Sequence, residues 1–225
     1  MTSSAVLFSG GLDSAVLLAL ELADHAPVWP IHVRAGLAWE DAEARTIARL
    51  LAAPPFGGRV EPPATLAMEM RDVYPPAHWA IEGRPPAYDT PDEDVYLEGR
   101  NVVLIAKAAV WCARHGVERL AIGPLAGNPF PDATPAFFGT MARAMSLGLA
   151  QPFTVVAPLV AYHKEDVVRL GIERNVPLDR TLSCMNPAGD RHCGLCSKCR
   201  ERRDAFRIAG VEDRTVYAAE WSPGR

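Results

Sequence analysis

The chain has 225 residues, of which 49% are hydrophobic, and its formal net charge is −4 at pH 7. This length and composition allow one large domain with a substantial core. The acidic balance argues against non-specific nucleic-acid binding, which requires a broad basic surface. Since no apolar run reaches the roughly 18 residues of a membrane span and the first residues lack a signal-peptide pattern, we expect a cytoplasmic protein without a membrane partner.

A phosphate-binding turn follows the first predicted strand. After the strand over residues 5–8 comes Ser9-Gly10-Gly11-Leu12-Asp13-Ser14, and then a helix over residues 15–23. The glycines let the backbone approach an anion closely, and amides at a helix N-terminus favour negative charge. A Walker loop would end in Gly-Lys-Ser/Thr, whereas this turn has no lysine. It resembles the pyrophosphate loop (PP-loop) of ATP pyrophosphatases, which implies AMP transfer. The alternative is an ordinary strand–turn–helix junction without a ligand.

The following segments alternate between strand and helix patterns. Residues 28–33, 119–122 and 153–159 are predicted strands, and residues 40–51, 100–115, 135–147 and 163–174 are predicted helices. Four Pro-Pro pairs between residues 54 and 86 exclude long regular elements there, so we treat residues 54–98 as a surface excursion or a lid. The pattern predicts an α/β fold with a doubly wound, mainly parallel sheet. We place an ATP-binding domain at residues 1–180.

Four cysteines cluster near the C-terminus. Cys184, Cys193, Cys196 and Cys199 have the spacing C-x8-C-x2-C-x2-C, which suits a tetrahedral Zn²⁺ ion. We therefore predict a small zinc segment at residues 181–215, packed on the ATP-binding domain. An iron–sulfur cluster and a catalytic redox pair are the alternatives. The stretch from Arg180 to Arg207 is also locally basic, which is typical of a solvated helix face or of a nearby anionic substrate.

Together these motifs resemble the 7-cyano-7-deazaguanine synthase family of queuosine biosynthesis, within the PP-loop ATP pyrophosphatase superfamily. The resemblance rests on the Ser9–Ser14 turn and on Cys193-Gly194-Leu195-Cys196-Ser197-Lys198-Cys199, and it extends to Gly99-Arg100-Asn101 and Pro131-Asp132. It implies an ATP-dependent ligase that adenylates the carboxylate of 7-carboxy-7-deazaguanine and converts it with ammonia, through the amide, to the nitrile. It also implies ATP, Mg²⁺ and Zn²⁺ as cofactors and a homodimer.

The resemblance assigns roles to particular residues. Catalytic roles fall to Ser9, Asp13, Ser14, Arg100 and Lys164. The last two of these supply the positive charge that the turn lacks. ATP binding falls to Ser9, Gly10, Gly11, Leu12, Asp13, Ser14 and Val33. Substrate binding falls to Asn101 and Asp132, and metal binding to the four clustered cysteines. For Arg100 and Lys164 the alternative is a surface charge, and for Asp132 it is a turn residue.

Two segments depart from the family pattern. Residues 33–40 lack the usual Gly-Gln-Arg-His sequence, and residues 126–134 lack the tyrosine, cysteine and arginine of the usual loop. A paralogue that forms an amide or nitrile on a different carboxylate is therefore an alternative. A PP-loop tRNA sulfur transferase is another, although the acidic composition argues against a nucleic-acid partner. A non-enzymatic zinc module is the third.

Overall fold

A five-stranded sheet forms the centre of the computed structural model, which describes residues 2–222. All its strands are parallel, in the order β3-β2-β1-β4-β5. The strands are β1 (Ser4–Leu7), β2 (Val28–Arg34), β3 (Ala64–Ala67), β4 (Arg119–Ala121) and β5 (Thr154–Val156). The chain builds outward from β1 in both directions, which creates a crevice between β1 and β4 at the carboxyl edge of the sheet. The predicted α/β class is confirmed.

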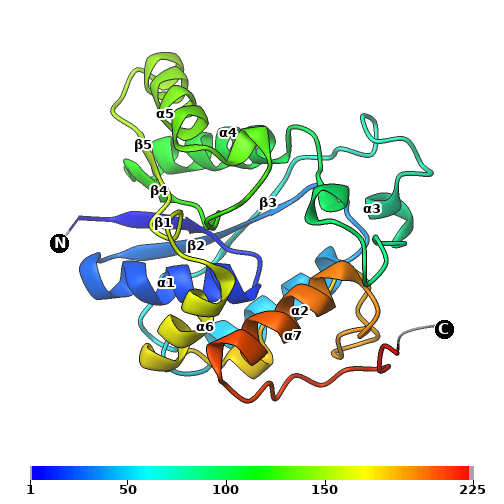
Figure 1. The fold of residues 1–225 in the computed structure, drawn as a ribbon. Helices are drawn as coiled ribbons and strands as arrows, with labels where there is room; N and C mark the ends of the chain where they lie inside the picture. The colour runs from blue at the N-terminus through cyan, green and yellow to red at the C-terminus, as the bar shows by residue number, and fades with distance from the viewer. Residues whose placement is uncertain (1, 223–225) are drawn as a thin grey trace.

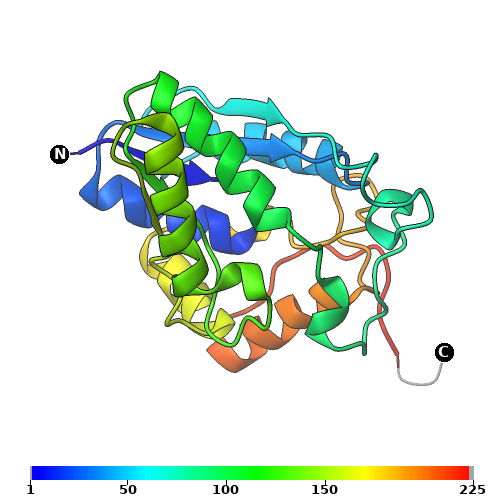
Figure 2. The same ribbon diagram turned by 90° about the horizontal axis from the view of Figure 1, so that it is seen from above.

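Helices cover both faces of the sheet (Figure 1). One layer contains α1 (Leu12–Asp24), α2 (Glu40–Leu51), α6 (Lys164–Glu173) and α7 (Ser197–Ala209). The other contains α4 (Arg100–Arg114) and α5 (Pro135–Leu149), which lie over the strands when seen from above (Figure 2). Each layer has its own apolar core, because strand side chains alternate between the two faces. The predicted helix over residues 40–51 matches α2 at both ends.

The proline-rich excursion contains only short elements, as its composition predicts. These are β3, the four-residue helix α3 (Trp79–Glu82) and a 3-10 helix over Asp92–Val95. We did not predict β3, whose four residues pair with β2 in parallel register. The excursion is attached to the chain after β2 through Trp39, whose ring stacks on Trp79 with centroids 5.7 Å apart. Its part after β3 lies beyond the carboxyl ends of the strands (Figure 1), next to the crevice.

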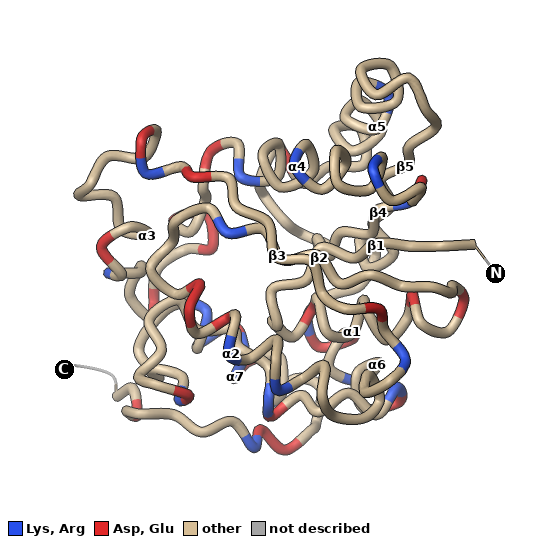
Figure 3. Tube along the Cα trace, turned by 180° about the vertical axis from the view of Figure 1, so that it is seen from behind, with Lys and Arg blue, Asp and Glu red and all other residues tan. Residues whose placement is uncertain are grey.

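The C-terminal segment packs on the face that carries α1 and α6. Ala205 and Phe206 of α7 belong to the same apolar core as Leu17 of α1 and Val167 of α6. The division into a domain over residues 1–180 and a segment over residues 181–215 stays a prediction. Within residues 2–222, no helix is both long and apolar enough to cross a membrane. Acidic and basic residues are mixed along the trace, and Figure 3 shows no single broad basic region within the described residues.

Candidate active site

The turn between β1 and α1 collects backbone amides and hydroxyl groups at one end of a helix. Gly10 has φ +75°, and a Cβ there would lie 3.1 Å from Thr46 Cγ2, so only glycine fits without strain. Ser9 Oγ accepts a hydrogen bond from Gly11 N (3.3 Å), and Ser14 Oγ donates to Gly11 O (3.0 Å). The two serine hydroxyls are 3.5 Å apart. This arrangement suits a phosphate group at the N-terminus of α1.

Two adjoining cavities open at this turn, with volumes of about 280 Å³ and about 410 Å³. Ser9, Gly11, Asp13, Glu43 and Arg100 line both. The first cavity also contains Ser14, Val33, Asn101 and Asp132, and the second contains Leu12 and Lys164. Among the predicted non-cysteine site residues, only Gly10 is absent from both walls, because it packs against α2. The crevice is therefore where the topology places ligand binding in such sheets.

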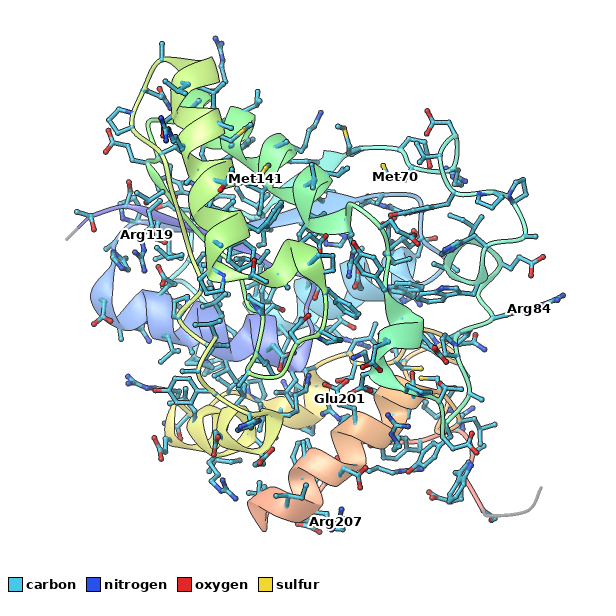
Figure 4. The ribbon with its side chains drawn as sticks, turned by 45° about the horizontal axis from the view of Figure 1, so that its top comes forward. Met70, Arg84, Arg119, Met141, Glu201 and Arg207 are labelled. Carbon is cyan, nitrogen blue, oxygen red and sulfur yellow. The ribbon has the colours of Figure 1, made fainter. Side chains whose placement is uncertain are left out.

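Lys164 links the turn to the C-terminal segment. Its Nζ lies 2.7 Å from Asp13 Oδ2 and 3.3 Å from Glu201 Oε1. Burial alone would lower the pKa of Lys164, but these two carboxylates hold it above its ordinary value. Glu201 also contacts Lys198 at 2.6 Å, and Figure 4 shows Glu201 where α7 faces α6. A cation is thus present beside the lysine-free turn, although it comes from 151 residues away.

Arg100 supplies a second cation from the first residue of α4. Its Nε is buried and has no hydrogen-bond partner among residues 2–222, although the side chain lines both cavities. A buried guanidinium nitrogen without a partner is costly, so an anionic ligand oxygen would stabilise it. The structure therefore brings Arg100 and Lys164 to the same crevice.

Asn101 and Asp132 bind each other. Asp132 Oδ2 accepts a hydrogen bond from Asn101 N (2.9 Å), and Asn101 Nδ2 donates to Asp132 O (3.0 Å). The carboxylate is buried and stabilises the N-terminus of α4, where negative charge is favourable. Asp132 therefore has a structural role in addition to lining the first cavity. Its predicted contact with substrate stays a prediction.

Sequence reasoning missed two buried ionisable residues, His32 and Glu43. His32 Nε2 lies 3.9 Å from Glu43 Oε2, and their side chains are 6% and 9% exposed. Burial raises the pKa of Glu43 to about 7, and it lowers the pKa of His32. The sequence contained a signal for the burial of Glu43. This residue precedes Ile47 by four positions and Leu50 by seven, so all three lie on the same buried face of α2.

The outer wall of the first cavity is aromatic and apolar. Tyr96 stacks on Phe130 with ring centroids 5.0 Å apart, and Val95 and Leu97 lie beside them. Three of these residues end the proline-rich excursion, so the excursion forms part of the wall. Other parts of it point to solvent, as Arg84 does in Figure 4. Motion of the excursion as a lid stays a prediction.

The four clustered cysteines converge at the start of α7. Their sulfur atoms all lie within 4.8 Å of one another. The Sγ atoms of Cys193 and Cys196 lie 3.8 and 3.5 Å from that of Cys199. A tetrahedral ion with 2.3 Å bonds to sulfur would separate its ligands by about 3.8 Å. A four-iron cluster holds its thiolates on separate iron atoms and hence farther apart. The geometry therefore fits a single metal ion.

Arg202 connects this cysteine segment to the chain after α6. Its guanidinium is fully buried and donates to Thr215 Oγ1 (2.7 Å), Thr181 Oγ1 (2.9 Å), Ser183 Oγ (3.0 Å) and Leu178 O (2.5 Å). Because these hydroxyl and carbonyl partners come from two separate stretches, residues 178–183 and Thr215, Arg202 fixes how the segment sits on the rest of the protein. These hydrogen bonds offset the desolvation cost of the buried guanidinium.

Known proteins resemble this chain over most of its length. The 7-cyano-7-deazaguanine synthase of Anaeromyxobacter dehalogenans (strain 2CP-C) is 35% identical over 223 residues, which cover 95% of this chain and 94% of the relative. The protein of that name from Methanothrix thermoacetophila is 32% identical over 226 residues, covering 96% and 99%. Among solved structures, a predicted subunit of a tRNA methyltransferase from Methanocaldococcus jannaschii covers 77% of this chain and 75% of its own, with a TM-score of 0.49 at 16% identity.

A family profile described as "Queuosine biosynthesis protein QueC" matches residues 3–210. This range includes the phosphate-binding turn, both cavities and all four clustered cysteines. The resemblance drawn from the Ser9–Ser14 turn and the cysteine spacing is thereby confirmed. The chain belongs to the QueC family.

Proposed function

We propose that this protein is an ATP-dependent ligase that converts 7-carboxy-7-deazaguanine and ammonia into 7-cyano-7-deazaguanine. The observation that carries the proposal is the lysine-free phosphate turn with Lys164 and Arg100 beside it, in a chain of the QueC family. Such a turn leaves the α-phosphorus of ATP open to an acceptor oxygen, because its amides hold the outer phosphates.

The reaction uses two adenylations. A carboxylate oxygen attacks the α-phosphorus of ATP, and pyrophosphate leaves. Ammonia then attacks the carbonyl carbon of the acyl-adenylate, AMP leaves, and the nitrogen releases a proton to give the amide. The amide oxygen attacks a second ATP, and the resulting O-adenylate loses AMP and its remaining N–H protons to form the nitrile. Lys164 and Arg100 stabilise the charge on the phosphates in both adenylations.

Two metals fit the residues present. Asp13 Oδ1 is buried and has no hydrogen-bond partner within residues 2–222, so it offers an oxygen to a Mg²⁺ ion, which would neutralise phosphate charge when bound. The four clustered cysteines offer a tetrahedral sulfur site, for which Zn²⁺ is our assignment. In this proposal zinc has a structural role, because it holds together a segment with few apolar residues.

A specific alternative exists for the acceptor, which is the compound whose carboxylate receives the adenylyl group. The loop over residues 126–134 and the segment over residues 33–40 depart from the family pattern, and the first of them supplies Asn128 and Phe130 to both cavities. A paralogue acting on a different carboxylate is therefore the second candidate. The sulfur transferase is weaker, because Cys112 is fully buried and burial raises its pKa to about 12. A homodimer, free ammonia as nitrogen donor, a cytoplasmic location and no nucleic-acid partner stay predictions.

Mass spectrometry of the purified protein with 7-carboxy-7-deazaguanine, ATP, Mg²⁺ and ammonium tests the proposal. We expect the nitrile, with the amide as an earlier product. Formation of neither compound would refute this substrate. AMP formation that depends on another heteroaromatic carboxylate would favour the paralogue.

A further inference from the structure

Glu43 occupies the junction of the two cavities. It is on α2, and it lines both cavities with Ser9 and Asp13 of the phosphate turn and Arg100 of α4. Its side chain is 9% exposed, so its carboxylate is held mainly among protein atoms. A ligand that extends from the phosphate turn into the first cavity must therefore pass next to it.

Four of the five other carboxylates that line the two cavities bind a charged or backbone partner, and the fifth, Glu165, lines only the second cavity. Asp13 and Glu201 both contact Lys164, at 2.7 and 3.3 Å, and Asp132 accepts a backbone amide at the start of α4. Among residues 2–222, only the buried His32, at 3.9 Å, is within salt-bridge distance of Glu43. A carboxylate that already binds an ammonium group or a backbone amide has fewer oxygen lone pairs free to take up a proton from a ligand. Among the carboxylates of the first cavity, Glu43 is therefore the one best placed to accept a proton.

His32 lines the first cavity beside Glu43 and supports this role. Its Nε2 is buried and has no hydrogen-bond partner within residues 2–222, whereas Glu43 Oε2 lies 3.9 Å away. A small movement of either side chain would form a hydrogen bond. The imidazole can therefore orient the carboxylate and stabilise its proton.

The proposed reaction has two halves, amide formation and nitrile formation. In both halves, protons are lost from the nitrogen that is bound to the former carboxylate carbon. Ammonia loses one proton when it becomes the amide nitrogen, and the amide loses both N–H protons when it becomes the nitrile. A positioned protein group that receives these protons would speed both halves of the reaction. We infer that Glu43 is the catalytic proton acceptor for the substrate nitrogen and that His32 is its positioning residue. This inference rests on the proposed function.

Each step balances with Glu43 as acceptor. In the second half, the amide oxygen bonds to the α-phosphorus and pyrophosphate leaves, while one N–H proton passes to Glu43 and a C=N double bond forms. After Glu43 returns this proton to solvent, the C–O bond breaks and its electron pair leaves with AMP. The last N–H proton passes to Glu43 as the C≡N triple bond forms. No oxidant or reductant is required.

Separate measurement of adenylation and of nitrogen chemistry tests the inference. With 7-carboxy-7-deazaguanine but no ammonia, exchange of labelled pyrophosphate into ATP reports the first adenylation, which needs no proton acceptor on nitrogen. We expect Glu43→Gln to keep this exchange within about threefold of wild type and to slow amide and nitrile formation on the order of 100-fold or more. The control is Glu98→Gln, because Glu98 is an exposed carboxylate near the same wall. This control should change neither rate.

Nitrile formation within about fivefold of wild type in Glu43→Gln, or equal loss of exchange and nitrile formation, would overturn the inference. If wild type shows no exchange of labelled pyrophosphate into ATP that depends on 7-carboxy-7-deazaguanine, the proposed function is refuted. The assignment of Glu43 is then refuted with it. If the glutamine variant loses its metal or its folded state, Glu43→Asp decides the matter. A shorter carboxylate should keep exchange and slow nitrile formation about tenfold, and an unchanged nitrile rate would overturn the inference.

The pH profile of nitrile formation gives a second readout. The charged and titratable groups that face Glu43 are His32 and Arg34 on β2, Glu40 on the same helix and Arg100 on α4. Burial raises the pKa of Glu43 to about 7 despite the opposing charge of Arg100. Because free ammonia also increases with pH, the profile is measured from the amide and ATP without ammonium. Under these conditions wild type should gain activity as the pH rises through about 7, and Glu43→Gln should lose this step. Persistence of the step in the variant would also overturn the inference.

Discussion

The ammonium group of Lys164 lies 2.7 Å from Asp13 Oδ2, although the two residues are 151 positions apart in the sequence. The contact places a cation from the start of α6 beside the phosphate turn at the start of α1. Glu201 holds the same ammonium group from α7, the helix that begins in the cysteine cluster. The phosphate turn and the cysteine segment therefore share one electrostatic network.

Replacement of Lys164 by methionine should remove the charge that faces the phosphates. We expect kcat/KM for ATP to fall on the order of 100-fold or more, because charge stabilisation in the transition state is lost. Steady-state measurement of AMP release checks this. Lys107→Met is the matched control, since Lys107 is on α4 outside both cavities. An equal effect of both variants would argue against a specific role for Lys164.

Local motifs in the sequence predicted the parts of the site that are built locally. The turn with Gly10 and the cysteine spacing each lie within a short segment, so residue type and spacing are sufficient to identify them. The boundaries of α2 followed from its apolar periodicity for the same reason.

Features that depend on tertiary contacts were harder to predict. β3 has only four residues between proline-rich segments, and its pairing with β2 forms it. Glu43 is one of several charged residues on α2, so its residue type suggested a solvent-exposed position. It is buried because α2 packs against the turn at Gly10. The hydrogen bond from Asn101 N to Asp132 Oδ2 likewise joins residues that are 31 positions apart in the sequence.

Loss of one metal ligand should unfold the cysteine segment. Cys196→Ala is expected to release bound zinc and to lower the melting temperature, because few apolar residues hold this segment without metal. Metal analysis and thermal unfolding check this. Cys112→Ala, a change at a buried cysteine outside the cluster, should keep the metal. Ser14→Ala should also keep the bound zinc, although it should lose catalytic turnover. A Cys196→Ala protein with full metal content would contradict the assignment of these cysteines as metal ligands.

Arg202→Met should destabilise the protein by about 3 kcal/mol, because it leaves buried hydroxyl and carbonyl groups without their charged donor. Denaturant unfolding measures the change. Arg207→Met on the same helix is the control, since Arg207 is exposed and pairs only with Asp204 among the described residues, and it should alter stability by less than about 0.5 kcal/mol. Similar losses in the two variants would show that burial of Arg202 has no special energetic weight.

Glu43 should make stability depend on pH in a defined direction. Its pKa is about 7 in the folded protein against an ordinary value of 4.5, so between these values the folded state binds more protons than the unfolded state. Stability therefore falls as the pH rises from about 4.5 to about 7, by about 3 kcal/mol in total. Glu43→Gln should remove this loss and be more stable than wild type at pH 8.

Denaturant unfolding at pH 5 and pH 8 checks this, with Glu98→Gln as the control for other titrating groups. The advantage of Glu43→Gln over wild type should be larger at pH 8 than at pH 5. An advantage that is the same at both values would mean that Glu43 titrates normally in the folded protein.

The products of ATP cleavage test the central claim most directly, namely that the lysine-free turn presents the α-phosphorus to an acceptor oxygen. Wild-type protein with α-labelled ATP, 7-carboxy-7-deazaguanine and ammonium should yield labelled AMP and pyrophosphate, with two AMP for each nitrile. Labelled ADP with inorganic phosphate and no AMP would contradict the account.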